Sequence, residues 1–294
     1  MLLRIAQGDS YCLATEYIKH PRDTELQEKV LKFDRYYKHP NHSLKPGQYS
    51  DDTQLSIAVT EVLMLDGAQD MSEATLSRAF VESFVRCFKR DPRDGYSRGF
   101  QAILEEIQNA DEFVLKIVPN SDKNGACMRA VPIGVLPNVE DVLAVSEMQA
   151  KITHNTPEGV WSAQAVAMMS HFALHSDKAF SEMGQFCTEY FDEGFSDHIG
   201  QDFNERVCTP HVAIKTVQAA YHAIIGSTNL LDVMRKIILW GGDTDTVAAV
   251  AWGIASTRMT ENLPPFFDGG LEDGEFGRDF LLKLGTDLME RYSG

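Results

Sequence analysis

Apolar residues recur at helical spacing along most of this chain, and few segments alternate apolar and polar residues as strands do. In residues 73–88, for example, Leu76, Phe80, Phe84 and Phe88 fall on one stripe. The same spacing recurs in residues 139–154, 158–175, 209–226 and 229–240. Such a succession of amphipathic helices with short polar joints predicts an all-α fold.

The ends of these segments and the regions between them carry further signals. The stretch TVAAVAWGIA, which begins at Thr246, is apolar on every side and is expected at the centre of the molecule. Pro210 suits a first helical turn, and Gly226 suits the residue just after a last one. Residues 34–49 and 111–138 have weak periodicity and contain Pro, Gly and Asn, so we interpret them as loops.

Length and composition favour one domain that covers residues 1–294. The chain is 44% hydrophobic and shows no linker, repeat or low-complexity tract. After about residue 258 the sequence predicts a Pro- and Gly-containing loop and a closing helix with a structural role.

Charge and cysteine content bound the partners and the compartment. With 27 Lys and Arg against 43 Asp and Glu, the net charge of -16 argues against nucleic acid and anionic membranes as partners. The five cysteines are scattered and form no CxxC motif, which favours reduced thiols in the cytoplasm. No stretch approaches the roughly 18 uninterrupted apolar residues of a membrane span.

Two helix starts crowd carboxylates together. YSDDTQLSIAV places Asp51 and Asp52 before an apolar run, and GGDTDTVAAVAWGIA does the same with Asp243 and Asp245. Either cluster alone could be explained by helix capping, but a cap needs only one oxygen. If the two starts face each other, the four carboxylates can balance two divalent cations. An all-oxygen set favours Mg²⁺ or Mn²⁺ over Zn²⁺.

Several separated stretches resemble, in the same order, the motifs of the ADP-ribosylglycohydrolase family. GDSYCLATE, from Gly8 to Glu16, is similar to the family's GDAxGxxxE pattern, and YSDDT is similar to its TDDT. NGACMRAVPIG, from Asn124, is similar to its NGAAMR segment, and ITH and GGDTDT follow. The resemblance runs from residue 8 to residue 246. Two departures are Ser50 in place of Thr and Cys12 in place of Gly.

This resemblance implies a compact orthogonal multi-helix bundle with a binuclear Mg²⁺ or Mn²⁺ centre between helices. The metal ligands that it implies are Ser50, Asp51, Asp52, Asp243, Asp245 and Thr246. The charge argument from the residues alone points to the same four carboxylates.

For catalysis, the resemblance makes Glu16 the candidate carboxylate near the scissile bond, although an ordinary surface Glu is an equal reading. It also places Asp94, in RDPRDGYSRGF, on the acceptor side of the distal ribose. Asp94 precedes Gly95, and a DG pair is by itself a turn signal.

For substrate binding, the resemblance points to a loop beside the diphosphate and to an imidazole beside the adenine. The loop residues are Ser121, Asn124, Gly125 and Met128, and the imidazole belongs to His154. Gly-containing loops of this kind are common, and His154 could equally be a helix cap or a core residue.

The implied reaction is hydrolysis of the bond between ADP-ribose and an acceptor on a modified protein. Arginine-linked ADP-ribose is favoured, serine-linked ADP-ribose or another conjugate stays open, and a monomer is favoured. A non-catalytic ADP-ribose binder is the main alternative, which the intact carboxylates disfavour. A class I isoprenoid synthase would need DDxxD, but here the fifth position is Leu55.

Two histidine pairs could suggest a metal site. His171 and His175 are spaced i, i+4, but the Glu of HExxH is missing, so we interpret them as packing residues. His39 and His42 lie in a polar loop and are equally unconvincing as ligands.

Overall fold

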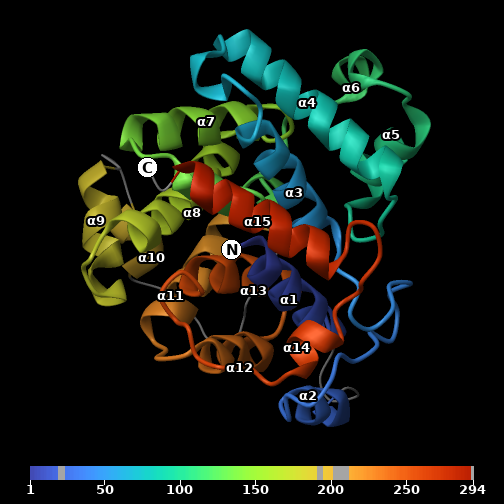
Figure 1. Ribbon diagram of the computed structural model, residues 1–294, viewed down its shortest axis with the longest axis vertical. Coiled ribbons are helices and arrows are strands. Elements are labelled where there is room, and N and C mark those ends of the chain that lie inside the picture. The colour runs from blue at the N-terminus through green and yellow to red at the C-terminus, as the bar shows by residue number, and fades with distance from the viewer. Residues whose placement is uncertain (19–23, 191–194, 201–211, 293–294) are drawn as a thin grey trace.

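A computed structural model describes residues 1–18, 24–190, 195–200 and 212–292 of the chain (Figure 1). Within these ranges there are fifteen α-helices and five short 3₁₀ helices, and the β pairing is confined to one isolated bridge between Asn120 and His154. The predicted all-α fold is confirmed. The α-helices are α1 Leu2–Cys12, α2 Thr24–Val30, α3 Asp51–Leu63, α4 Glu73–Arg90, α5 Arg98–Glu106, α6 Ala110–Lys116, α7 Val139–Lys151, α8 Pro157–His175, α9 Met183–Tyr190, α10 Phe195–Gly200, α11 Ala213–Ile225, α12 Leu230–Trp240, α13 Thr244–Ala255, α14 Phe266–Gly269 and α15 Arg278–Tyr292. The 3₁₀ helices are η1 Leu13–Thr15, η2 Ala68–Asp70, η3 Asn124–Ala126, η4 Val131–Val135 and η5 Phe180–Glu182.

Helix α13 lies at the centre of this arrangement. Every one of its residues is buried, because α1, α8, α11 and α12 pack around it (Figure 1). The central placement predicted for the apolar stretch from Thr246 is therefore correct. The helices α4, α5 and α6 lie at one end of the molecule, and α2 lies at the other (Figure 1).

A glycine allows α1 and α13 to touch through their backbones. A Cβ atom built on Gly8 would lie 2.5 Å from the carbonyl oxygen of Ala248, which is closer than real Cβ atoms come. The next residue, Asp9, is therefore carried to the start of α13 and to the start of α3, which also packs on α1. This close contact sets the geometry of the site described below.

Some boundaries differ from the sequence prediction. Residues 34–49 form no helix, as expected. The region 111–138, however, contains all of α6 except its first residue, together with the 3₁₀ helices η3 and η4. Helix α6 begins because the Asn109 side chain accepts a hydrogen bond from the Glu112 amide at 3.0 Å. With only Ala110 and Phe113 buried, α6 is too short to show a clear apolar period.

Two further predictions are confirmed, one for the end of a helix before Gly226 and one for a closing helix after residue 258. Gly226 follows the last residue of α11, and a loop after residue 258 leads to the closing helix α15, which packs on α1. Pro210 and Cys208 lie outside the described residues. The four described cysteines are buried and unpaired. Among the described helices, none combines the length and the apolar composition needed to cross a membrane.

The contact between α1 and α13 gives a first prediction. Gly8→Ala should lower the free energy of unfolding by about 1–3 kcal/mol, because the new methyl group must push the two backbones apart. Gly99→Ala is the matched control, since Gly99 also lies in a helix but has open space around it. There the change should stabilise by about 0.5–1 kcal/mol. Urea unfolding measures both, and equal effects would contradict the close contact.

Candidate metal centre and cavity

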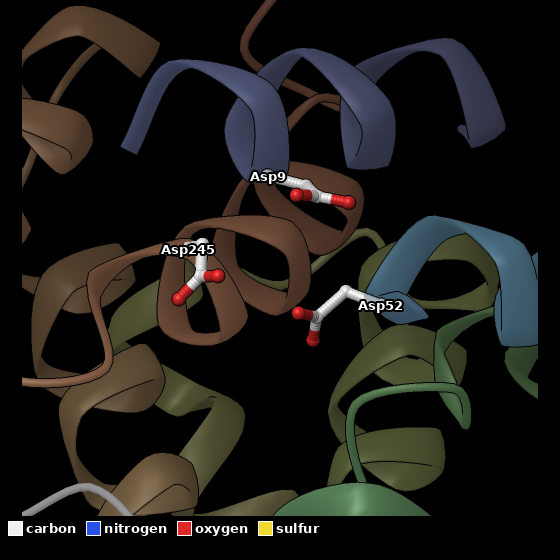
Figure 2. Close-up of side chains that lie close together, drawn as sticks. All are labelled: Asp9, Asp52 and Asp245. Carbon is white, nitrogen blue, oxygen red and sulfur yellow. The ribbon is translucent and has the colours of Figure 1, made fainter. Parts of the chain in front are cut away.

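The first turns of α3 and α13 meet beside α1, and three carboxylates converge on the space between them (Figure 2). Asp9 from α1, Asp52 from α3 and Asp245 from α13 each offer an oxygen within 4.8 Å of the others. Glu16, Asp243 and Asp245 form a second group with the same spacing. Because Asp245 belongs to both groups, the arrangement offers two adjacent positions that share one carboxylate.

Among the aspartates of this cluster, two oxygens are buried without a hydrogen-bond donor: Oδ1 of Asp52 and Oδ1 of Asp245. Glu16 Oε2 also accepts no hydrogen bond, although His42 Nε2 lies 2.7 Å from it. The other oxygen of Asp52 is satisfied, because it accepts from Ser50 Oγ and from Thr246 Oγ1, each at 3.2 Å. An unpaired buried carboxylate oxygen is costly unless a cation or a proton neutralises it. An all-oxygen donor set of this kind fits Mg²⁺ or Mn²⁺.

Asp9, a residue of α1, caps the N-terminus of α3. Its carboxylate accepts from the amide of Ser50 at 2.9 Å, from the amide of Thr53 at 3.2 Å and from the hydroxyl of Thr53 at 2.6 Å. The start of α3 is therefore tied to α1 rather than only to its own Ser50 side chain. Asp52 is held in place by this joint.

Asp243 is held by two donors from outside its own helix. Its Oδ2 accepts from the Tyr17 hydroxyl at 3.0 Å and from Asn124 Nδ2 at 2.9 Å. Tyr17 has φ +47°, a conformation that residues other than Gly rarely adopt, and its amide donates to the Gly242 carbonyl at 2.8 Å. Residues held in such strained backbone conformations cluster at functional sites.

The loop between α4 and α5 approaches Asp51 at Gly95. Gly95 has φ +123°, and a Cβ atom there would overlap the Asp51 carboxylate and lie 3.1 Å from the Asp51 amide nitrogen. Only glycine fits both the backbone angle and the space. The DG pair predicted as a turn is therefore also a close contact with the acidic cluster.

Burial dominates the titration of these carboxylates. It raises the pKa of Asp51, Asp52 and Asp245 well above the usual value, and neighbouring carboxylates raise each of them further. Burial also raises the pKa of Asp9 to about 6, against the opposite effect of the hydrogen bonds from Thr53 and Ser50. Several of these groups therefore need a compensating positive charge to be ionised together at neutral pH.

A cavity of about 580 Å³ opens over this cluster. Its volume is in the range of ligand-binding pockets. The residues singled out from the sequence that line it are Glu16, Asp51, Asp52, Ser121, Asn124, Gly125, Met128, His154, Asp243, Asp245 and Thr246. Lys116, Lys123 and Arg129 add positive charge to the same lining.

Two of the singled-out residues do not line this cavity. Ser50 is fully buried behind Asp52, to which its hydroxyl donates. Asp94 lines a neighbouring cavity of about 400 Å³, together with Arg90 and other residues. Its carboxylate accepts from the Ser43 hydroxyl and, at 3.2 Å, from Gln101 Nε2.

The loop and the imidazole expected beside the substrate contact each other. A Cβ atom on Gly125 would lie 2.9 Å from the His154 ring, so this glycine lets the loop rest against the imidazole. His154 is buried, and its Nδ1 lies 2.6 Å from Thr153 Oγ1. Burial and the nearby Arg129 lower the pKa of His154 to about 3, so the ring is neutral at physiological pH.

Sequence reasoning missed three contributions to the site. Asp9 is the first, although its place beside Gly8 in the GDS stretch is a usable signal. Lys116 is the second, because the sequence predicts a loop where α6 lies, and nothing in the sequence marks the third, the contact between Tyr17 and Asp243.

The histidine pair on α8 has a packing role, as interpreted from the sequence. His171 Nδ1 lies 3.0 Å from the Leu136 carbonyl, and His175 Nε2 lies 3.2 Å from the Val135 carbonyl. Each ring is therefore hydrogen-bonded to the backbone of the segment that includes η4.

The model of the family described as ADP-ribosylglycohydrolase matches residues 1–294. This chain belongs to the ADP-ribosylglycohydrolase family. A solved structure titled ADP-ribosylglycohydrolase-related protein complex has the same fold, with a TM-score of 0.76 at 20% identity over 99% of this chain and 96% of that chain. The resemblance stated from the motifs and the fold type that it implied are confirmed.

Curated members of the family are distant relatives. The chain is 24% identical over 240 residues to the ADP-ribosylarginine hydrolase Tri1 of Serratia proteamaculans, covering 76% of this chain and 64% of that protein. It is 25% identical over 230 residues to the ADP-ribosyl-dinitrogen reductase glycohydrolase of Rhodospirillum rubrum, covering 75% and 72%. It is 27% identical over 139 residues to human ADP-ribosylhydrolase ARH3, covering 45% and 37%. The chain thus spans less than two thirds of the length of the Serratia protein.

The raised pKa values predict how stability depends on pH when divalent cations are removed. A carboxyl group with a raised folded-state pKa favours folding below its unfolded pKa, near 4, and this advantage is lost as the pH rises toward the folded value. In EDTA, the free energy of unfolding should therefore fall from about pH 5 to about pH 7. Asp52→Asn should make this fall shallower by up to about 1.4 kcal/mol per pH unit. Urea unfolding at several pH values measures the slopes, and parallel slopes would contradict the pKa of Asp52 being raised.

Proposed function

We propose that this chain is a metal-dependent hydrolase that cleaves the bond between ADP-ribose and an acceptor, with arginine-linked ADP-ribosyl protein as the favoured substrate. The observation that best supports this is the pair of carboxylate groups sharing Asp245, with two donorless oxygens, next to a ligand-sized cavity. The Serratia relative is named for ADP-ribosylarginine, which favours that linkage. Serine-linked and other conjugates stay open.

The proposed ligands of two Mg²⁺ or Mn²⁺ ions are Ser50, Asp51, Asp52, Asp243, Asp245 and Thr246. Bound there, the ions would supply positive charge that orients the ribose hydroxyls and lowers the pKa of a water molecule. Asp9 is proposed to hold Asp52 in place, because its hydrogen bonds go to the first turn of α3. Tyr17 and Asn124 hold Asp243 in the same way.

The protein's own groups have separate roles in this scheme. As the bond from the anomeric carbon to the acceptor nitrogen breaks, a water oxygen bonds to that carbon, and the transition state has oxocarbenium character. Glu16 is proposed to accept the proton of this water, because its carboxylate lies beside Asp243 and Asp245 at the cavity. The proton then moves to the departing guanidine group. Asp94, which lines the neighbouring cavity, is the second candidate for accepting the proton of the water.

The rest of the cavity is proposed to bind the ADP part of the substrate. The loop with Ser121, Asn124, Gly125 and Met128 faces the space that a diphosphate would need, and Lys123 adds a cation to it. The neutral ring of His154 is proposed to border the adenine, because an uncharged imidazole can pack on a base without a desolvation penalty for charge.

The deciding experiment is hydrolysis of ADP-ribosylated arginine and serine peptides by the purified chain with Mg²⁺ or Mn²⁺. The arginine conjugate should release ADP-ribose faster, and Asp52→Asn should lose about 100-fold or more in kcat/KM. The folded state of the variant is checked by circular dichroism. Tight binding of ADP-ribose by the wild type without turnover of either peptide would instead favour the non-catalytic binder.

Metal binding can be tested without turnover. At neutral pH, Mg²⁺ or Mn²⁺ should raise the Tm of the EDTA-treated wild type, because the ions bind only the folded arrangement of carboxylates. Asp245→Asn removes the carboxylate common to both groups, so its Tm should no longer respond at the same concentration. Glu25→Gln, an exposed residue on α2, is the control and should respond as the wild type does. An unchanged response in Asp245→Asn would contradict the proposed centre.

A further inference from the structure

We propose that His42 is a positioning residue that holds the Glu16 carboxylate at the cavity through a direct contact between its imidazole and that carboxylate. This inference deepens the proposed function and rests on the role given there to Glu16. His42 was set aside in the sequence because a histidine pair in a polar loop lacks a metal-site pattern. The structure gives the pair a different use.

The loop of residues 34–49 contacts Glu16 at two points, its carboxylate and its carbonyl oxygen. His42 Nε2 lies 2.7 Å from Glu16 Oε2, which binds the side chain. His39 Nε2 lies 2.8 Å from the Glu16 carbonyl oxygen, which binds the backbone. Two histidines three residues apart thus fix both ends of one catalytic candidate.

The ring of His39 is fixed by its own loop. Its Nδ1 accepts from the amides of Asn41 and His42 at 3.1 and 3.0 Å, so this nitrogen carries no proton. Nε2 is therefore the protonated nitrogen and donates to the Glu16 carbonyl. With Nδ1 already bonded to two amides and Nε2 to a carbonyl, His39 is unsuited to hold a metal ion.

The loop that carries His42 has no helix, but hydrogen bonds and a buried side chain hold it in place. Lys38 Nζ donates to the carbonyls of His42, Ser43 and Leu44 at 2.5, 2.9 and 2.5 Å. Leu44 is buried, and the Ser43 hydroxyl donates to Asp94. These contacts place His42 against Glu16 in advance. The loop therefore loses little conformational freedom when substrate binds.

Glu16 needs such a partner because its other neighbours are negative. Its carboxylate faces Asp243 and Asp245 at the start of α13. Burial raises the pKa of Glu16, and the charge of Asp243 raises it further. His42 opposes this effect, and the Glu16 carboxylate beside it raises the pKa of His42 in turn. Asp94 raises the pKa of His42 further, and Lys38 lowers it.

Kinetics of the Mg²⁺-loaded protein with the ADP-ribosylated arginine peptide test the role. His42→Ala should lower kcat about ten-fold or more while KM stays within about two-fold, because substrate binding does not use this contact. His42→Gln keeps a donor at the same reach and should recover kcat to within about three-fold of the wild type. A wild-type kcat in His42→Ala, a change in KM alone, or equal loss in both variants would overturn the proposal. His198→Ala, an exposed histidine on α10, is the control.

A stability cycle separates this inference from the proposed function. In EDTA, His42→Ala should lower the Tm of the wild type, and it should lower the Tm of Glu16→Gln by less than half as much. Equal shifts in the two backgrounds would show that the histidine does not act on the carboxylate. Absence of hydrolase activity in the wild type would sink the proposed function, while this cycle would still decide whether His42 holds Glu16.

Discussion

The hydrogen bonds that the Asp9 carboxylate accepts from the start of α3 are the constraint on which the site depends. They tie α3 to α1, and Gly8 lets α1 touch the backbone of α13, so three helices share one joint. Because two of these helices begin there, their acidic first turns face each other instead of facing solvent. A helix start normally tolerates acidic residues because of its dipole, but this joint removes the water that would otherwise screen them.

This concentration of buried charge opposes folding unless something neutralises it. Burial raises the pKa values of Asp51, Asp52 and Asp245, and each carboxylate also raises those of its neighbours. Protonation is one solution, but it leaves the oxygens less able to bind a cation. Divalent ions are the other solution, and they convert mutual repulsion into binding energy. The same property that makes the cluster costly without ions would make ion binding favourable there.

Sequence reasoning recovered the helices and the acidic clusters better than the links between them. The centre of the fold was predictable because α13 is apolar on every side, and Asp52 and Asp245 were brought together by a charge argument. The capping of α3 by Asp9 was not predictable, because the two residues that it joins to α1 are more than forty positions away along the chain. Helix α6 was lost because only two of its residues are buried, so its periodicity is weak.

The two kinds of carboxylate in this cavity are held in different ways. Asp52 and Asp245 belong to the first turns of packed helices, so their positions follow from the core. Glu16 lies after η1 and before the strained Tyr17, where no helix fixes its side chain. The loop with His39 and His42 supplies what the helices do not, by bonding both its carbonyl and its carboxylate. Packed helices thus suit charges that must stay in place, and contacts from a separate loop would suit a group such as Glu16, for which we propose a role in proton transfer.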